Sequence, residues 1–368
     1  MRIGLMGFGV VGKGVYEIVS RRQDMEVTKV LCLEEITLPT GEAVKNFNDI
    51  LTDDTIDTVV EAMGGLHPAY EFVRAALEAG KNVVSSNKAL VCTFYDELLP
   101  LAQSKGVSFR CTAAVGGGIG WLSELERARR VQELTSVGGI MNGTCNYILD
   151  NMTRKGADYD AVLKEAQALG YAEFNPSTDV DGIDTWHKII LSGNIAFGVS
   201  LDKETVPVAG IRNITASDVE SFTAHGKVCK LISTATRKDG RYSAYVQPTL
   251  VPADSLEGNV PLNFNLITFM GATSDKMSFY GQGAGRYPTA YNVVQDLVDV
   301  LSGKGFYAPY GGKVPAENDT LLTWYVRGNW QGETAGNWGS GVITGPVAVN
   351  DMHRWLKENP DAFAAALA

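Results

Sequence analysis

The chain has 368 residues, of which 45% are hydrophobic and 20% charged, as is typical of a folded protein long enough for two domains. Its formal net charge of −10 argues against nucleic acids and anionic membranes as partners. No apolar run approaches the ~20 residues that span a bilayer. The first predicted strand begins at once, so we expect no signal peptide and a cytoplasmic location. Five scattered cysteines and four distant histidines lack metal-site spacing.

The start of the chain predicts a strand, a tight glycine turn and a helix. An apolar run leads into Gly7-x-Gly9-x-x-Gly12, and a helical pattern continues to about residue 21. Such a turn directs backbone N–H groups and a helix N-terminus at a pyrophosphate. Gly7 permits the turn, Gly9 lets phosphate approach the backbone, and Gly12 lets the helix pack on the strand. The motif favours a dinucleotide site over a purely structural turn.

Two alternatives bear on which nucleotide binds. A nucleoside-triphosphate loop has Gly7, Gly12 and Lys13 at the same spacing, but it next requires a serine or threonine, and position 14 is glycine. The second predicted strand ends at Glu34, about twenty residues past the glycines, where an acid accepts the ribose hydroxyls of NAD. No arginine stands there to hold the 2′-phosphate of NADP. A solvated loop acid is a nearly equal interpretation of Glu34.

The first ~110 residues alternate strands and helices. Further strands are predicted at 58–62, 82–85 and 107–111, and helices at 68–79 and 94–105. Alternation with short connections predicts an α/β fold with a Rossmann-type, doubly wound parallel sheet. Ligands of such sheets bind at the C-terminal ends of the strands, where Gly64 and Ser86-Asn87-Lys88 fall.

The pattern changes after residue 115. Mixed helical and β periodicity over 116–285 predicts an α+β domain for substrate binding and dimerisation, beside a dinucleotide-binding domain over 1–115. A helix predicted at 288–301 is expected to return to the first domain, which residues 286–368 complete. The tail after residue 302 is rich in glycine and tryptophan and shows no clear period.

One short segment concentrates charge. Glu173, Asp179, Asp181, Asp184 and Lys188 lie close together, and a helical pattern begins near Asp181. Asp184 and Lys188 are then i,i+4 neighbours on one helix face. Such a cluster suits an ammonium ligand and a lysine placed for proton transfer. On spacing alone, a surface salt bridge is the favoured interpretation.

Several ordered segments together resemble the homoserine dehydrogenase family over residues 1 to about 302. They comprise Gly7 to Gly14, Gly80 to Leu90, Gly139 to Leu149, Ala166 to Lys188, Val246 to Pro252 and Tyr280 to Ala290. The resemblance implies reversible hydride transfer between NAD or NADP and homoserine or aspartate 4-semialdehyde, in threonine and methionine biosynthesis. It also implies a homodimer or a tetramer of dimers.

The resemblance assigns roles by position. Lys188 is similar to the catalytic acid/base or carbonyl-polarising lysine, Asp184 to the aspartate that positions it, and Lys88 to the lysine between nicotinamide and substrate. The amino-acid end of the substrate is assigned to Tyr171, Glu173, Asp179, Gly143 and Thr144. The cofactor is assigned to Gly7, Gly9, Val10, Val11, Gly12, Glu34, Gly64, Ser86, Lys88 and Gly285. The cofactor itself supplies the hydride chemistry.

Two departures from the family concern a monovalent cation. The family usually has an acidic residue where this chain has Thr112, and a proline where it has Gly120. A sodium site formed by the carbonyl groups of Val115, Gly117 and Ile119 is therefore doubtful.

Other departures motivate alternative functions. Tyr291-Asn292 replaces small residues of the family, and Thr112 and Gly120 add to these changes. A related dehydrogenase of another amino alcohol or amino aldehyde is one alternative. A dinucleotide-binding protein without turnover is another, although both candidate lysines are present.

Overall fold

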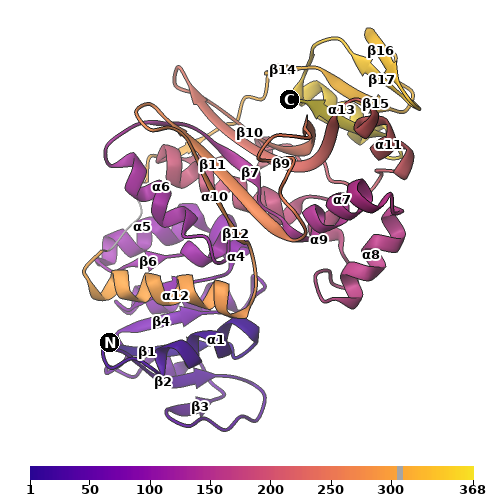
Figure 1. The fold of residues 1–368 in the computed structure, drawn as a ribbon. Helices are drawn as coiled ribbons and strands as arrows, with labels where there is room; N and C mark the ends of the chain where they lie inside the picture. Colours follow the sequence, from indigo (N-terminus) through magenta and orange to yellow (C-terminus); the bar gives the residue numbers. More distant parts are fainter. Residues whose placement is uncertain (305–309) are drawn as a thin grey trace. The chain divides into compact units, whose positions relative to one another are not determined.

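The computed structural model describes residues 1–304 and 310–368 (Figure 1). The chain divides into two compact units. Unit 1 consists of Met1–Val131, Asn194–Ser200 and Gln282–Lys313, and unit 2 of Gln132–Gly193, Leu201–Gly281 and Val314–Ala368. Residues 305–309, which fall within the expected completing segment 286–368, lie outside the described residues.

Unit 1 is built on a six-stranded sheet whose paired strands all run parallel. The strand order is β3-β2-β1-β4-β5-β6. The strands are β1 (Arg2–Met6), β2 (Glu26–Leu31), β3 (Glu42–Val44), β4 (Thr58–Glu61), β5 (Asn82–Ser85) and β6 (Phe109–Arg110). This is the order of a dinucleotide-binding Rossmann sheet. The predicted α/β class and doubly wound parallel sheet are confirmed.

One buried apolar cluster of unit 1 combines residues of the strands with residues of two helices. The helical segments are α1 (Val10–Val19), α2 (Asn48–Leu51), α3 (Ala69–Glu78), α4 (Lys88–Thr93), α5 (Tyr95–Lys105), η1 (Thr112–Ala114), α6 (Trp121–Arg129) and α12 (Arg286–Leu301). Helices α1 and α12 pack together (Figure 1), and Val15 and Val293 join strand residues such as Leu5 in one buried cluster. Thus the distant segment predicted to return to the first domain does pack in unit 1.

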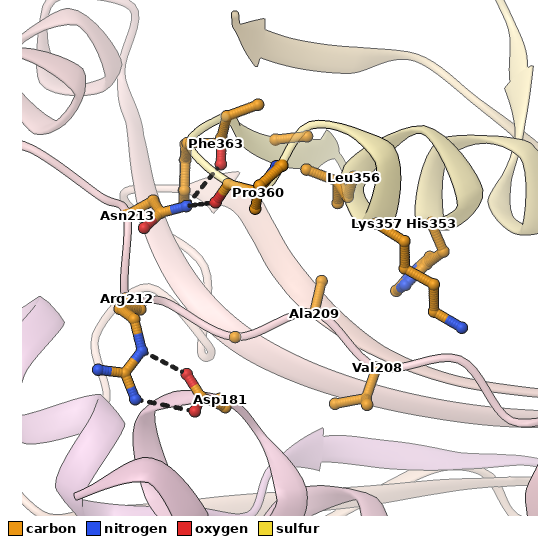
Figure 2. A pocket seen from close by; sticks show the side chains of 13 residues that line it. Asp181, Val208, Ala209, Arg212, Asn213, His353, Leu356, Lys357, Pro360 and Phe363 are labelled. Carbon is orange, nitrogen blue, oxygen red and sulfur yellow. Dashed lines mark hydrogen bonds and ion pairs between the residues drawn. The ribbon is translucent and has the colours of Figure 1, made fainter.

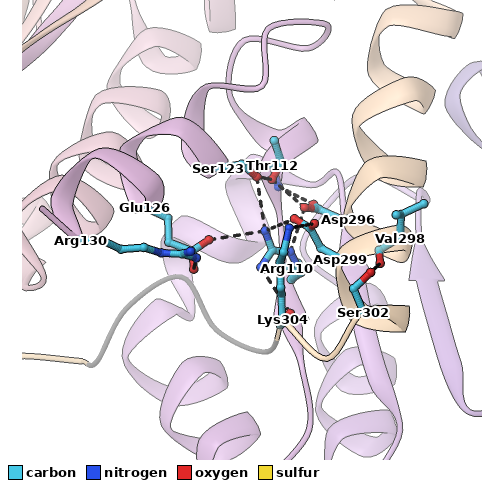
Figure 3. A network of polar contacts seen from close by, with 10 residues as sticks. All are labelled: Arg110, Thr112, Ser123, Glu126, Arg130, Asp296, Val298, Asp299, Ser302 and Lys304. Atoms are coloured by element: carbon cyan, nitrogen blue, oxygen red, sulfur yellow. Dashed lines mark hydrogen bonds and ion pairs between the residues drawn. The ribbon is translucent and has the colours of Figure 1, made fainter.

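A buried arginine ties α12 to the last strand of the sheet (Figure 3). The Arg110 side chain is fully buried, and its Nε lies 3.1 Å from an oxygen of Asp296, while Nη2 lies 2.8 Å from Asp299. Thr112 donates from its backbone N–H and its hydroxyl to Asp296, each at 2.7 Å. Burial raises the pKa of Asp296, and the charge of Arg110 opposes that shift. Burying these charges costs free energy, but every charge in the network has a partner. Removing one partner would leave a buried charge unpaired, which is strongly destabilising.

Unit 2 is built on a nine-stranded sheet with the order β12-β11-β7-β9-β10-β19-β15-β17-β16. Its strands are β7 (Leu134–Ile140), β9 (Lys227–Lys238), β10 (Arg241–Pro252), β11 (Phe264–Gly271), β12 (Asp275–Gln282), β15 (Trp324–Arg327), β16 (Thr334–Trp338), β17 (Gly341–Thr344) and β19 (Phe363–Leu367). Strand β7 pairs antiparallel with β9 and β11, and β10 pairs parallel with β19. Two smaller sheets pair β8 (Ser200–Leu201) with β13 (Lys313–Val314) and β14 (Leu321–Leu322) with β18 (Val347–Ala348).

The helices that follow β7 carry the candidate residues of unit 2. The helical segments are α7 (Gly143–Lys155), α8 (Tyr159–Ala168), α9 (Ser177–Val180), α10 (Ile183–Phe197), η2 (Lys203–Thr205), α11 (Ala216–Ala224) and α13 (Val349–Glu358). Helix α7 begins at Gly143, because the Asn142 side chain caps it by accepting from the Cys145 N–H at 2.8 Å. In the described chain, no helix is both long and apolar enough to cross a bilayer.

The tail differs from its expected place. Residues 314–368 belong to unit 2 and do not complete unit 1. Strand β19 inserts between β10 and β15, and Trp324, Met352 and Ala364 share a buried cluster with Tyr245 of β10. Short strands of four or five residues in a glycine-rich segment carry too little periodicity to be recognised from sequence.

A cavity of about 260 Å³ opens where the tail meets α9 (Figure 2). Arg212 pairs through two nitrogens with Asp181 on one side, each contact at 2.8 Å, and Lys357 and His353 stand on the other side. The His353 ring is buried, with Nε2 3.1 Å from the Gln247 side-chain oxygen. Burial lowers the pKa of His353 to about 4.

The depressed pKa of His353 makes stability depend on pH. Between about pH 6.5 and pH 4 the unfolded chain binds a proton on this histidine and the folded chain does not, so unfolding is favoured as the pH falls. Over that interval the free energy of unfolding of the wild-type protein should fall by on the order of 3 kcal/mol because of this histidine, and His353→Gln should abolish this decrease. Denaturant unfolding of both proteins near pH 7 and near pH 4 measures the difference. His225→Gln, at an exposed histidine, is the control and should keep the wild-type pH dependence; an unchanged slope in His353→Gln contradicts the prediction.

Candidate functional site

The glycine turn of unit 1 has three glycines with three different physical requirements. Gly7 has φ +93°, and a Cβ on Gly12 would lie 2.1 Å from the Gly7 carbonyl oxygen, so both positions require glycine for the fold itself. A Cβ on Gly9 would meet no atom within 4 Å. The chain therefore does not need glycine at position 9 for packing, and the open space over this residue suits the close approach of a ligand.

A cavity of about 950 Å³ lies over this turn. It is lined by Gly7, Gly9 and Val10 and also by Leu33, Glu34, Ala62 and Phe72. Three cationic residues, Lys13, Lys45 and Arg286, line it as well. Val11 and Gly12 continue α1 just beyond the turn, so the helix begins directly at the cavity. Its size, apolar walls and cations suit a phosphate-bearing ligand with aromatic or apolar parts.

The far end of the same cavity holds Glu34. This residue is exposed after β2, and its backbone carbonyl accepts from the Lys45 Nζ at 2.6 Å. Lys45 Nζ also donates to the Leu33 carbonyl at 2.8 Å and lies 3.3 Å from a carboxylate oxygen of Glu35. Lys45 was not predicted, because it reaches this loop only through the pairing of β2 with β3.

A buried carboxylate organises the loops at the ends of β4 and β5. Glu61 is fully buried and accepts from the Met63 N–H at 2.9 Å, the Gly64 N–H at 3.4 Å and the Ser85 hydroxyl at 2.6 Å. Burial raises its pKa, and these hydrogen bonds oppose the shift. Sequence analysis missed Glu61, although an acid ending an apolar strand was a visible signal.

The candidates Gly64 and Ser86 both contact Glu61, and Lys88 follows two residues after Ser86. The Ser86 N–H donates to the Glu61 carbonyl at 3.1 Å, and the Asn87 amide donates to the Gly65 carbonyl at 2.6 Å. Lys88 is the first residue of α4, which Asn87 caps by accepting from the Leu90 N–H at 3.2 Å. The two loops are therefore fixed to each other, and Lys88 stands half-buried at the end of β5.

In unit 2, the predicted pair on α10 is present and buried. The Lys188 Nζ lies 2.7 Å from an oxygen of Asp184, and the two residues are 8% and 5% exposed. The same Nζ donates to the Met141 carbonyl at 2.6 Å. The surface salt bridge that spacing alone favoured is therefore wrong, because the pair is enclosed. A buried ammonium with two acceptors is held in one position, as proton transfer requires.

Asn142 joins two carboxylates of this cluster. Its side-chain Nδ2 donates to an oxygen of Asp179 at 2.7 Å and to Asp184 at 2.8 Å, while its oxygen caps α7. Burial raises the pKa of the Cys145 thiol, which has Asp179, Asp184 and Lys188 nearby. Asn142 was not predicted as a site residue; its only sequence signal was an N-cap position.

Three further candidates adjoin the cluster. A Cβ on Gly143 would lie 2.6 Å from the Asn263 carbonyl oxygen, so the start of α7 packs directly on that loop. The Thr144 hydroxyl donates to the Tyr171 carbonyl at 2.6 Å, and the Tyr171 ring packs edge-on against Tyr147 with centroids 5.1 Å apart. These contacts fix the loop after α8 to the start of α7.

Glu173 and Asp181 stand apart from the cluster. Glu173 is exposed in the loop between α8 and α9, and no hydrogen bond or ion pair joins its carboxylate to Lys188 or Asp184 within residues 1–304 and 310–368. Asp181 is paired with Arg212 instead. Of the acids in the charged segment, Asp179 and Asp184 are therefore the ones that Asn142 gathers.

The carbonyls of the doubtful sodium site lie after η1. The Asn292 amide, one of the departures at 291–292, donates to the Gly117 carbonyl. Thr112, where the family has an acid, donates hydrogen bonds to Asp296. Gly120 is the N-cap residue of α6 and makes no side-chain hydrogen bond. Gly285, which was predicted to bind the cofactor, has φ +128° and is the N-cap residue of α12. Among the described residues, no group of three or more His, Cys, Asp or Glu side chains is arranged to hold a metal. The sodium site stays a prediction.

Lys88 belongs to unit 1 and Lys188 to unit 2. A family model described as the NAD-binding domain of homoserine dehydrogenase matches residues 7–112, and one described as homoserine dehydrogenase matches residues 121–298. A homoserine dehydrogenase of Bacillus subtilis is 35% identical over 349 residues, which cover 89% of this chain and 81% of that protein.

The chain belongs to the homoserine dehydrogenase family. A Synechocystis homoserine dehydrogenase is 37% identical over 317 residues, covering 82% of this chain and 73% of that protein. The crystal structure of a homoserine dehydrogenase from Thiobacillus denitrificans has a TM-score of 0.86 and 29% identity, and covers 100% of this chain and 98% of that one. A hyperthermophilic archaeal homoserine dehydrogenase in complex with NADPH shares the fold, with a TM-score of 0.70 and 20% identity over 82% of this chain and 98% of that one.

Proposed function

We propose that this chain is an NAD- or NADP-dependent homoserine dehydrogenase, which interconverts L-homoserine and L-aspartate 4-semialdehyde. The observation that carries the proposal is the buried Lys188–Asp184 pair with the Met141 carbonyl as its third member. Membership of the family supports the substrate, and the cavity over the glycine turn supports a dinucleotide. A cytoplasmic homodimer, or a tetramer of dimers, belongs to the same proposal.

Proton transfer in this proposal takes place at Lys188. When homoserine is oxidised, the neutral amine accepts the hydroxyl proton as hydride leaves; in the reverse direction the ammonium returns the proton to the carbonyl oxygen. The bound nicotinamide supplies the hydride chemistry. Asp184 and the Met141 carbonyl hold the lysine nitrogen in place. Lys88, at the end of β5, is proposed as the second lysine of the reaction.

Charge in the lysine cluster favours a substrate that carries an ammonium group. Two carboxylates, Asp179 and Asp184, are gathered around one lysine, so the cluster has an excess negative charge when all three are ionised. The amino group of homoserine supplies the opposite charge. We also propose Gly143, Thr144, Tyr171 and Glu173 as residues around the amino-acid end, with Glu173 reaching it from its exposed loop.

For the cofactor, we propose that Gly7, Gly9, Gly12, Val10 and Val11 form the pyrophosphate cradle. Space over Gly9 and the N-terminus of α1 support this placement. Gly64, Ser86, Lys88 and Gly285 are proposed to line the rest of the cofactor site. We propose that Glu34 gives a slight preference for NAD, because its carboxylate accepts ribose hydroxyls and repels a 2′-phosphate. The archaeal relative was solved in complex with NADPH, which supports keeping NADP as the alternative cofactor.

A direct assay tests the function. Purified protein is mixed with L-homoserine and NAD or NADP, and the absorbance of the reduced nicotinamide is followed. A panel of other amino alcohols tests the alternative substrate that Tyr291-Asn292 motivates. Faster reduction with another amino alcohol supports that alternative, and dinucleotide binding without reduction of any substrate supports a protein without turnover.

Substitution of Lys188 tests its proposed role in proton transfer. Lys188→Met removes the proton-transferring group and should lower kcat/KM by roughly 10²- to 10⁴-fold while the protein stays folded. Steady-state kinetics with circular dichroism measures both quantities, and Lys88→Met should also abolish most turnover.

Lys230 provides a matched control for the loss at Lys188. This lysine of β9 is buried in the same unit, and burial lowers its pKa to about 8. Its Nζ donates to the Asn146 side chain and the Val260 carbonyl, which are not proposed site residues. Folded Lys230→Met should keep most activity. Equal losses in the Lys188 and Lys230 variants contradict the assignment.

Substitution of Glu34 tests the proposed choice of cofactor. Glu34→Gln removes the negative charge near the ribose while Lys45 remains beside it, so the ratio of kcat/KM for NAD over NADP should fall roughly tenfold. Kinetics with each cofactor measures the ratio. Glu42→Gln, an exposed acid on the neighbouring strand β3, is the control and should leave the ratio unchanged. A ratio that stays at the wild-type value in Glu34→Gln rejects the role of Glu34.

A further inference from the structure

Asn265 on β11 is a fully buried amide with an unusual hydrogen-bond pattern. Its side chain is 0% exposed, and its Nδ2 donates to the Met141 carbonyl at 3.0 Å. Its Oδ1 is buried and accepts no hydrogen bond from any described residue. The orientation of the amide is set by chemistry, because turning it over would place its oxygen against the Met141 carbonyl oxygen.

The Met141 carbonyl connects Asn265 to the candidate lysine. The same oxygen accepts from Lys188 Nζ at 2.6 Å, so the amide and the ammonium share one acceptor. Sheet register produces this arrangement: β11 pairs antiparallel with β7 with Leu266 opposite Ile140, which places the preceding Asn265 beside the following Met141. The two contacts therefore meet at the Met141 carbonyl oxygen, where they join α10 and β11 to the end of β7.

The orphan oxygen points to a missing donor. Leaving a buried amide oxygen without a partner costs about 1–3 kcal/mol, and folded proteins keep few such groups. The ammonium of Lys188 has three N–H groups, of which Asp184 and Met141 receive two. A single water molecule beside Lys188 can satisfy both residues, because it accepts one hydrogen bond and donates another.

We propose that Asn265 is a positioning residue for Lys188: its Nδ2 holds the Met141 carbonyl against the ammonium, and its Oδ1 accepts a hydrogen bond from a water molecule that Lys188 also binds. This inference rests on the proposed function, because it takes Lys188 as the proton-transferring group. Asn265 does not touch the substrate. It acts by keeping the lysine nitrogen in place and by stabilising its charged form.

The electrostatic surroundings make the effect of Asn265 measurable. The ionisable groups around Lys188 are Asp184 on its own helix, Asp179 on α9, linked through Asn142, and the Cys145 thiol on α7. Strands β7 and β11 contain no ionisable side chain, so Asn265 is the neutral polar group that β11 contributes. Removing it weakens the support for the ammonium without changing the charge of the cluster.

Asn265→Leu is the main test, because leucine has a similar volume and no polar atoms. We expect kcat for homoserine oxidation to fall about tenfold or more, consistent with a lost hydrogen-bonded network, while KM changes less than about threefold. The pH that gives half-maximal kcat should move lower, because the neutral amine becomes easier to reach. Asn318→Leu is the control: Asn318 is also 0% exposed, bonds to Thr205, Ser243 and Ala244, and should leave kcat and the pH profile unchanged.

A pair of smaller substitutions keeps the proposal testable if the leucine variant does not fold. Asn265→Ser and Asn265→Ala leave nearly the same space, but serine retains an acceptor for the water molecule. The serine variant should have a kcat about tenfold above the alanine variant at equal thermal stability. Equal kcat values in that pair, or an unshifted pH profile in folded Asn265→Leu, overturn the proposal. An inactive wild-type protein with both cofactors instead overturns the proposed function.

Discussion

An ammonium group and a carboxylate that are both almost fully buried must satisfy each other and find further partners, because desolvation costs each of them several kcal/mol. Lys188 and Asp184 meet this constraint through the Met141 carbonyl on one side and the Asn142 amide on the other. Each partner comes from the end of β7, so the strand, the start of α7 and α10 are fixed together. A surface ion pair with the same spacing would not fix these elements together, because water can solvate both charges.

Amides, and not further charged side chains, connect the buried ion pair to the groups around it. Asn142 donates to two carboxylates at once, which lets both remain close to a single lysine. Asn265 donates to the carbonyl that holds that lysine. Amides suit this task because they provide strong donors without altering the net charge on which recognition of an amino-acid substrate depends.

In the glycine turn of unit 1, the fold requires two of the three glycines but not the third. Gly7 and Gly12 are required by backbone angle and by close approach, whereas the space over Gly9 is open. Around this turn, Lys13 and Arg286 line the same cavity although they are far apart in sequence. Glu61 performs the corresponding structural task at the next strand end, where it binds the N–H groups that shape the Gly64 turn.

Local patterns predicted the parallel sheet, the glycine turn and the i,i+4 pairing of Lys188 with Asp184, because each depends on residues close in sequence. Long-range pairing could not be predicted in the same way. Asn265 reaches Met141 across 124 positions through strand register, and the tail joins the sheet of unit 2 through short strands with little periodicity. Burial of the ion pair was likewise invisible, since spacing shows that two residues share a helix face but not what covers it.

A double-mutant cycle on kcat/KM for homoserine tests the central claim most directly, because it asks whether Lys188 and Asp184 act as a unit. If Asp184 acts through Lys188, the Lys188→Met/Asp184→Asn protein should lose no more than about twofold beyond Lys188→Met alone. Losses that multiply in the double variant would show that the two residues act independently, and would contradict the account.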